Sequence, residues 1–230
     1  MKALAFDVYG TLVDPARLAE PLRSLTSAPA EFAAAWRTRQ IEYTFLVSLM
    51  GLYLSFSEVT ERALRASAER HRVPLTPAQV ESLVGAWRSL PPFPDVTPAL
   101  TALKHRYTLS VLSNGDAAMV RDVLRHGGLE GFFSEVISAE EVGVYKPSPR
   151  VYAHAAERLA TPPREVVLVS SNPFDVLGAK SAGMPSCWVN RADAALDDLG
   201  IRPDLEVRSL EDVPAALGSR WPVTRDRPRP

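Results

Sequence analysis

Short apolar runs alternate with helix-like stretches along much of this chain, and this alternation constrains the fold more than any other feature. The later helix-like stretches are Asp116–His126, Pro149–Ala160 and Asp175–Ala182, and in the second of them the apolar positions fall on a single face. Because strands that alternate with helices form βαβ units, the pattern predicts a parallel sheet. The runs expected to form its strands are Lys2–Phe6, Leu109–Leu112, Glu135–Ile137, Val166–Val169 and Ser186–Val189.

The segment between the first two runs is too long for a simple crossover, and its periodicity is almost entirely helical. We therefore expect a Rossmann-like α/β core formed by residues 1–14 and 93–220, with a helical cap domain, residues 15–92, inserted after the first strand. Residues 221–230 are rich in proline and arginine and are expected to form a flexible tail. The main helical segments of the insert are expected over Glu31–Ser48, Ser57–His71 and Thr76–Ser89.

Charge and composition exclude several classes of protein. The 230 residues include 26 basic and 27 acidic side chains, whereas nucleic-acid-binding proteins are usually strongly basic. The single cysteine, Cys187, allows no internal disulfide. The longest uncharged apolar stretch, residues 43–57, is shorter than the ~18–20 residues that cross a bilayer. Since Met1-Lys2-Ala3 leads directly into a strand and not into a signal peptide, we expect a cytoplasmic protein that binds neither membranes nor nucleic acid.

Polar side chains follow the predicted strands at the points where the strands end. Ligands of an open α/β sheet bind beyond the carboxyl ends of its strands. Asp7 follows the first run, Ser113 and Asn114 follow the second, Lys146 lies in the loop after the third, and Ser170–Asp175 follow the fourth. These groups are therefore expected to converge on one edge of the sheet. The insert leaves from the same edge, so it can act as a lid.

Asp7 is the candidate nucleophile. A buried carboxylate beside a cation stays ionised, because the opposite charge offsets the loss of hydration. Carboxylates in this state can form covalent intermediates. Lys146 is the cation expected beside Asp7. Taken alone, an aspartate before Gly10-Thr11 is as well explained by a turn or a helix cap; the other strand-end loops favour the catalytic interpretation.

Five motifs carry a family resemblance that extends over nearly the whole chain. Their order and spacing resemble those of the haloacid dehalogenase superfamily, and within it the type II L-2-haloacid dehalogenase branch. The motifs are FDVYGTL (Phe6–Leu12), SNG (Ser113–Gly115), KP followed by VY (Lys146–Tyr152), VSSN ending at Asp175 (Val169–Asp175) and the insert segment WRTRQIEYT (Trp36–Thr44).

Two positions separate this chain from the phosphatases that make up most of the superfamily. Phosphatases carry a second aspartate two residues after the nucleophile, which protonates the leaving alkoxide; this chain has Tyr9 there, and a halide needs no such proton. Phosphatases also carry a magnesium-binding aspartate in the fourth motif, where this chain has Ser171. We therefore expect no metal and no cofactor. The alternatives are a magnesium-dependent phosphatase acting on a small phosphate ester and a non-catalytic binding module.

The resemblance implies a role for each site residue. Asp7 attacks C2 of a short L-2-haloacid, and water activated by Asp175 beside Lys146 hydrolyses the aspartyl ester to a D-2-hydroxyacid. Thr11 orients Asp7, Tyr152 orders the charged pair, and Arg37 and Asn172 receive the halide. The remaining candidates are Ser170 in the catalytic set and, around the substrate, Val8, Tyr9, Ile41, Phe56, Ser113, Asn114 and Phe174.

Structural roles remain open for several of these residues. Thr11 and Asp175 are also suitable helix caps, Ser170 and Asn172 suit turns, Arg37 suits an exposed helix face, and Tyr152 suits core packing. Three departures from the branch's common pattern, at Thr38, Asp116 and Phe174, are expected to make the lining near the halogen smaller or less polar and so to alter chain-length or halide preference. In this branch the insert helices also pack against a second subunit, so a homodimer is expected.

Overall fold

The computed structural model describes residues 1–221 and contains a six-stranded, fully parallel sheet. The strand order is β3-β2-β1-β4-β5-β6, so the predicted α/β class is confirmed. All five predicted strands are present, with a sixth, β6, that the sequence did not reveal. Their bounds are β1 Ala3–Phe6, β2 Thr108–Ser113, β3 Glu135–Ser138, β4 Val166–Ser170, β5 Ser186–Val189 and β6 Leu205–Val207.

Burial explains why some strands were visible in the sequence and one was not. Every residue of β1, β4 and β5 is buried, which is the uninterrupted apolar pattern expected of strands covered on both faces. The edge strand β6 has three residues, of which only Val207 is buried. Its neighbours are charged residues and a proline, so no apolar run marks it.

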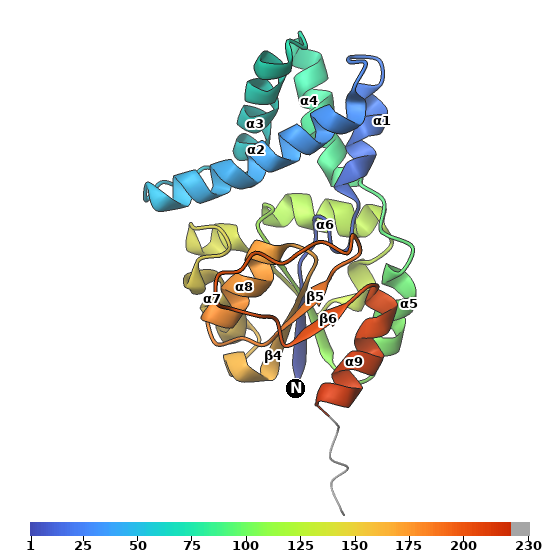
Figure 1. Cartoon of the computed structure of the whole chain (residues 1–230), viewed down its shortest axis with the longest axis vertical. Coiled ribbons are helices and arrows are strands. Elements are labelled where there is room, and N and C mark those ends of the chain that lie inside the picture. Colours follow the sequence, from blue (N-terminus) through green and yellow to red (C-terminus); the bar gives the residue numbers. More distant parts are fainter. Residues whose placement is uncertain (222–230) are drawn as a thin grey trace, which may run out of the picture.

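Helices cover both faces of the sheet. Helix α5 packs against α9, and α7 packs against α8; Figure 1 shows these two pairs on opposite sides of the strands. The strand order reverses between β1 and β4, and in open sheets this is where ligands bind. The helices of this part of the chain are α5 Val96–Leu103, α6 Ala117–His126, α7 Pro149–Arg158, α8 Pro173–Ser181 and α9 Val213–Arg220, of which α5 and α9 were not predicted.

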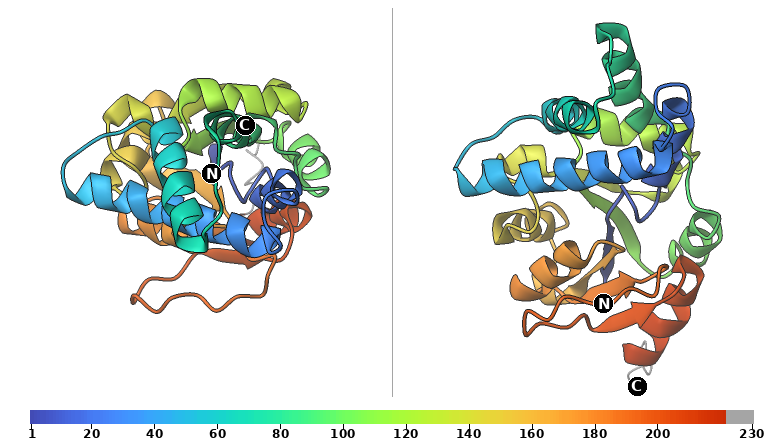
Figure 2. Two further views of the ribbon diagram at one scale, coloured as in Figure 1. Left: turned by 90° about the horizontal axis from the view of Figure 1, so that it is seen from above. Right: turned by 45° about the horizontal axis from the view of Figure 1, so that its top comes forward.

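Four α-helices, α1 to α4, lie between β1 and the return connection at Pro92 and stand above the carboxyl ends of the strands (Figure 1). Helix α2 packs along α3, and Figure 2 shows α2 crossing the molecule over the sheet. Two of the helices start at capping boxes, formed by Ser55 before α3 and Thr76 before α4. The bounds are α1 Ala19–Leu22, α2 Pro29–Leu49, α3 Phe56–His71 and α4 Pro77–Ala86. The last three lie close to the predicted main segments, and α1 corresponds to none of them.

The chain enters and leaves this helical segment through two hydrogen-bonded connections. The amide of Asp14 donates to the carbonyl of Pro91 at 3.1 Å, and the amide of Phe93 donates to the carbonyl of Leu12 at 3.0 Å. A β-bridge joins Val13 to Pro92 between them. The paired connections place both ends of the segment beside the loop that follows β1.

Two further predictions, on the C-terminal tail and on membrane spans, can be compared with the structure only over residues 1–221. Of the expected tail, residues 221–230, only Trp221 lies within the described residues. Among residues 1–221, no helix is both long enough and apolar enough to cross a membrane.

Candidate active site

Asp7 follows the last residue of β1 and is held by three side chains. It is 5% exposed. One oxygen, Oδ2, accepts hydrogen bonds from Thr11 Oγ1 at 2.8 Å and Asn172 Nδ2 at 2.7 Å. The other, Oδ1, accepts one from Lys146 Nζ at 2.9 Å. The carboxylate is therefore oriented by groups from three loops before any substrate binds.

Lys146 lies between the two carboxylates of the site. Its Nζ donates to Asp7, to Asp175 Oδ2 at 2.7 Å and to the Leu112 carbonyl at 2.9 Å, which uses all three ammonium hydrogens. Burial disfavours the charged amine, but attraction to Asp175 and Asp7 outweighs it and raises the pKa of Lys146 above its usual value. The side chain, only 1% exposed, therefore remains a cation.

Asp175 is fully buried in the first turn of α8. Tyr152 Oη donates to its Oδ1 at 2.9 Å, and Lys146 donates to its Oδ2. Burial and the negative charge of Asp7 raise the pKa of Asp175, against the opposing pull of Lys146. A raised pKa makes this carboxylate a better proton acceptor than an ordinary aspartate.

Gly178 allows α8 to approach this cluster. A Cβ at residue 178 would lie 2.5 Å from Pro147 Cβ and 2.6 Å from Tyr152 Oη, which is closer than real Cβ contacts. The glycine thus brings the helix that carries Asp175 against the loop of Lys146 and the hydroxyl of Tyr152. Sequence reasoning did not single it out.

Arg37 extends from α2 toward the carboxyl end of β1. Its Nη2 donates to the Tyr9 carbonyl at 3.0 Å, and its Nη1 donates to Gln40 Oε1 at 2.6 Å. Gln40 in turn donates to Thr60 Oγ1 of α3 at 2.5 Å, so the guanidinium is braced across both helices. Burial lowers the pKa of Arg37 to about 10, although the nearby Asp7 opposes the shift. Gln40 and Thr60 are supporting residues that the sequence did not reveal.

A nearly closed cavity lies between the sheet edge and the inserted helices. Its accessible volume is about 10 Å³, roughly the space of one water molecule. The predicted residues that line it are Asp7, Tyr9, Arg37, Ile41, Phe56, Ser113, Asn114, Lys146, Asn172 and Phe174, and Thr44 lines it as well.

The other predicted site residues lie behind this lining. Thr11, Tyr152 and Asp175 reach the cavity only through Asp7 and Lys146. Ser170 Oγ accepts the amide of Asn172 at 3.1 Å and makes no hydrogen bond to either carboxylate within the described part of the chain. The buried side chain of Val8 is not part of the cavity lining, which leaves its backbone amide to serve the site.

Hydrogen-bonding capacity remains free where a substrate carboxylate is expected. Ser113 Oγ accepts the Gly115 amide at 3.1 Å, which leaves its hydroxyl hydrogen available. Asn114 Oδ1 accepts the Lys146 amide at 2.9 Å, which directs its NH₂ group elsewhere. The backbone amides of Val8 and Tyr9 have no acceptor among residues 1–221.

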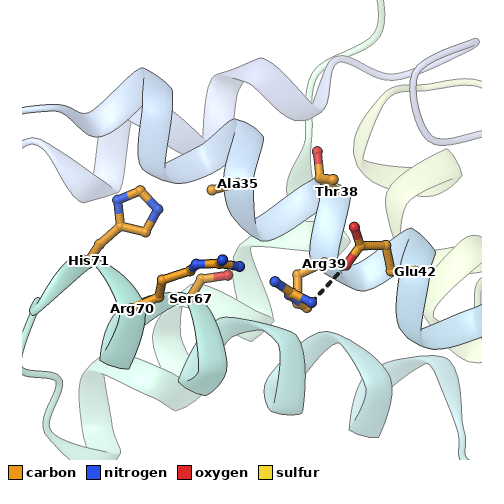
Figure 3. Close-up of a pocket in the computed structure, with 7 residues that line it drawn as sticks. All are labelled: Ala35, Thr38, Arg39, Glu42, Ser67, Arg70 and His71. Atoms are coloured by element: carbon orange, nitrogen blue, oxygen red, sulfur yellow. Dashed lines mark ion pairs between the residues drawn. The ribbon is translucent and has the colours of Figure 1, made fainter. Parts of the chain in front are cut away.

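Two of the departures noted in the sequence lie away from the cavity. Thr38 lines a separate opening of about 310 Å³ between α2 and α3, together with Ser67 and Arg70 (Figure 3). Asp116 contacts the start of α3 and is not part of the lining. The expectation that Thr38 and Asp116 contribute to the lining near the halogen is therefore wrong, because their side chains point to other parts of the insert; Phe174 does line the cavity.

Arg191 is a site residue that sequence reasoning missed. It follows β5 and donates to the Thr11 carbonyl at 3.1 Å and to Ser171 Oγ at 2.9 Å. Asp95 holds its guanidinium through both carboxylate oxygens. The guanidinium joins the loop after β1 to the loop after β4. Reading the residues beyond the fifth strand end, as was done for the first four, would have found it.

Comparison with known proteins connects this geometry to a family. Residues 1–183 match the family model described as haloacid dehalogenase-like hydrolase. The chain belongs to this family. An (S)-2-haloacid dehalogenase of Pseudomonas putida is 38% identical over 215 residues, covering 93% of this chain and 96% of the relative. A haloacetate dehalogenase of a Moraxella species is 35% identical with the same coverage.

A solved structure of the L-2-haloacid dehalogenase of Xanthobacter autotrophicus with chloropropionic acid covalently bound has a TM-score of 0.89 against this chain. It is 31% identical and covers 97% of this chain and 100% of its own. These matches confirm the superfamily and the L-2-haloacid dehalogenase branch inferred from the sequence, and with them the prediction of an enzyme.

The donor set does not fit magnesium, which phosphatases of the superfamily use. All four carboxylate oxygens of Asp7 and Asp175 already accept hydrogen bonds, two of them from one ammonium group. Ser171 provides a hydroxyl that faces the Arg191 guanidinium instead of a third carboxylate. A divalent ion here would have two carboxylates to bind and would lie near the Lys146 ammonium and the Arg191 guanidinium, so the donor set suits magnesium poorly.

Proposed function

We propose that this protein is an (S)-2-haloacid dehalogenase that hydrolyses short L-2-haloacids to D-2-hydroxyacids through an aspartyl ester, without a metal. The observation that carries the proposal is the state of Asp7: a buried carboxylate whose charge is balanced by Lys146 and whose orientation is set by Thr11 and Asn172. The covalently bound chloropropionic acid in the Xanthobacter relative supports the same chemistry.

The substrate carboxylate binds to groups that have hydrogen atoms to donate. These are the Ser113 hydroxyl, the Asn114 NH₂ group and the backbone amides of Val8 and Tyr9. All of them lie at the carboxyl ends of β1 and β2, so the anion is fixed beside Asp7. This anchoring supplies the positioning that makes attack by a carboxylate effective.

In the first chemical step, the bond between C2 and the halogen is replaced by a bond between C2 and an Asp7 oxygen. An Asp7 oxygen forms a bond to C2 while the carbon–halogen bond breaks on the opposite face, and the halide leaves with the electron pair. Arg37 and the Asn172 amide receive the halide, and the apolar side chains of Ile41, Phe56 and Phe174 exclude water around it. Attack from the opposite face inverts C2, so an L-2-haloacid yields a D-2-hydroxyacid.

The second step regenerates Asp7. A water molecule gives a proton to Asp175, whose raised pKa suits this task, and attacks Cγ of the ester. The bond between Cγ and the ester oxygen breaks, Asp175 returns the proton to that oxygen, and the hydroxyacid leaves while Asp7 is again a carboxylate. Lys146 contacts both carboxylates, so it stabilises the negative charge that moves between them, with Tyr152 holding Asp175 in place. Ser170 positions Asn172 through its amide.

The insert, residues 15–92, acts as a cap that closes over the reaction centre. The small cavity volume represents the closed form, and the paired connections at Val13 and Pro92 are suited to act as its hinge. Closure excludes water until the halide has left.

A homodimer is part of the proposal. Leu49 and Met50, at the end of α2, are 85% and 60% exposed, and an apolar groove of about 430 Å³ adjoins them, lined in part by Val144 and Pro147. A second copy covering this surface would bury it. Sedimentation should show a dimer for the wild type and a monomer for Leu49→Arg. The cytoplasmic location remains a prediction from the sequence.

Three measurements test the proposed reaction. Halide release should occur from L- but not from D-2-chloropropionate, and excess EDTA should not reduce it. In a single turnover in ¹⁸O-water with enzyme in excess, the product hydroxyl should carry ordinary oxygen, because that oxygen comes from Asp7. Label in the first product would indicate direct attack by water. Hydrolysis of p-nitrophenyl phosphate that EDTA abolishes would instead identify a phosphatase.

A further inference from the structure

Asp116 joins the sheet edge to the inserted helices. It follows the Ser113-Asn114-Gly115 loop, and one of its oxygens, Oδ1, accepts the Phe56 amide at 2.7 Å. The other, Oδ2, accepts the Ser57 amide at 2.9 Å and the Ser57 hydroxyl at 2.5 Å. A single carboxylate of the core thus takes three hydrogen bonds from the first turn of α3.

The Asp116 carboxylate accepts amides of α3 and none of α6, the helix that it precedes. Asp116 is the N-cap residue of α6, where an aspartate ordinarily accepts amides of the helix that it precedes, yet it makes no such bond. Glu140 accepts the first amide of α6, that of Ala117, at 2.7 Å. At α3, Ser55 accepts the amide of Glu58, and Asp116 accepts the two amides before it, so the start of that helix is satisfied from both sides.

The residue held by this contact is a wall of the reaction cavity. Phe56 lines the cavity and stacks on Tyr9 with ring centroids 5.7 Å apart. The loop that carries Asp116 also carries Ser113 and Asn114, which face the substrate carboxylate in the proposed function. Asp116 therefore sets the separation between the carboxylate-binding loop and the aromatic wall, and with it the room available at C2.

We propose that Asp116 is a positioning residue that holds Phe56 against the reaction centre and restricts the enzyme to short 2-haloacids. This inference rests on the proposed function for its substrate. Because the closed cavity has space for about one water molecule, the insert must move to admit a substrate. The contact between Asp116 and α3 is remade when the insert closes, and it returns Phe56 to one position.

Steady-state kinetics with chloroacetate and L-2-chlorobutyrate test the role. Asp116→Ala should lower kcat/KM for chloroacetate by about tenfold to a hundredfold, as expected for a misplaced site wall, with less loss for the longer substrate. Asp116→Asn keeps one acceptor and should restore part of the loss. The matched control is Asp122→Ala on the same helix, which removes a half-exposed ion pair to Arg88 of the insert at 2.7 Å without touching Phe56.

Equal kinetic losses in Asp116→Ala and Asp122→Ala would overturn the proposal, because Asp116 would then be one docking contact among several. A lower melting temperature with unchanged kcat/KM and an unchanged ratio between the two substrates would overturn it as well. The expected pattern is a changed substrate ratio in Asp116→Ala only.

A measurement that does not depend on enzyme activity distinguishes a failure of this proposal from a failure of the proposed function. Amide hydrogen exchange at Phe56 and Ser57 should accelerate at least about tenfold in Asp116→Ala and remain at the wild-type rate in Asp122→Ala. If the wild type released no halide and exchange still changed in this way, the proposed substrate would be wrong and the positioning of Phe56 would stand. Unchanged exchange in Asp116→Ala would overturn the positioning itself.

Discussion

The two sides of the reaction cavity are built differently. The sheet side consists of charged groups that are buried and saturated with hydrogen bonds: Asp7, Lys146 and Asp175 hold one another, and Thr11 and Tyr152 complete them. The insert side consists of Arg37 and apolar side chains, among them Ile41 and Phe56. It is joined to the sheet side by hydrogen bonds such as that from Arg37 to the Tyr9 carbonyl.

This difference matches two separate tasks. Charges that react must be in place before the substrate arrives, because reorganising them during the reaction would add to the barrier. A wall that admits and encloses the substrate has to move, so its apolar side chains stand outside the network of buried charges. Changes to the buried charges should therefore abolish the reaction, whereas changes to the apolar wall, or to the residues that hold it, should alter which substrates react.

Asp7→Asn should have the largest effect. An amide cannot act as the nucleophile, so halide release should fall by about 10⁴-fold or more. The measurement is halide release from L-2-chloropropionate after removal of any wild-type contaminant. Asp14→Asn, at an aspartate that caps the short turn at Pro15, is the control and should retain most of the activity. A loss of less than tenfold in Asp7→Asn would show that the nucleophile lies elsewhere.

Lys146→Met should both inactivate and destabilise the protein. It leaves two buried carboxylates facing each other without a cation, and breaking a buried pair in this way costs about 3–5 kcal/mol of unfolding free energy. Lys180→Met is the matched control on α8: it breaks a partly exposed pair to Asp204 and should cost no more than about 1 kcal/mol. Urea unfolding measures both, and equal costs would contradict the buried role of Lys146.

The pH dependence of kcat should report on the sheet side at acid pH and on the insert side at alkaline pH. Hydrolysis of the ester needs ionised Asp175, and because its pKa is raised, kcat should fall with decreasing pH at a point above the ordinary value of 3.8. Halide departure needs charged Arg37, whose pKa is about 10, so the alkaline decline should appear near there, while Lys146 keeps its proton. Arg37→Lys should shift the alkaline limb only. An acid limb at or below pH 3.8 would contradict the assignment of Asp175.

Phe174→Ala should have the smallest effect. Phe174 lines the cavity, packs edge-on to Phe45 of α2 at 5.2 Å and is partly exposed. Its loss adds room near the halogen, so the ratio of kcat/KM for L-2-chlorobutyrate to that for chloroacetate should rise a few-fold to about tenfold, the scale of one methylene in an apolar pocket. A fall in this ratio would show that Phe174 attracts the longer chain and does not exclude it.

The sequence alone was sufficient where a structural rule links a local sequence pattern to a position in the fold. Apolar runs marked the buried strands, and because parallel strands end at the same edge, Asp7, Lys146 and Asp175 could be brought together without coordinates. It was insufficient for β6, whose three residues carry no apolar pattern, and for Thr38, whose position next to Arg37 in the chain says nothing about which side of α2 it faces.

Only the tertiary structure decided which residues far apart in the chain are in contact. Arg191 reaches Thr11 across 180 residues, and Asp116 reaches Ser57 across 59. Gly178 matters only because Tyr152 and Pro147 pack against it. Local periodicity determines which elements form and where their ends lie, whereas the partner of a particular carboxylate or guanidinium depends on how the helices pack, which no short segment of sequence encodes.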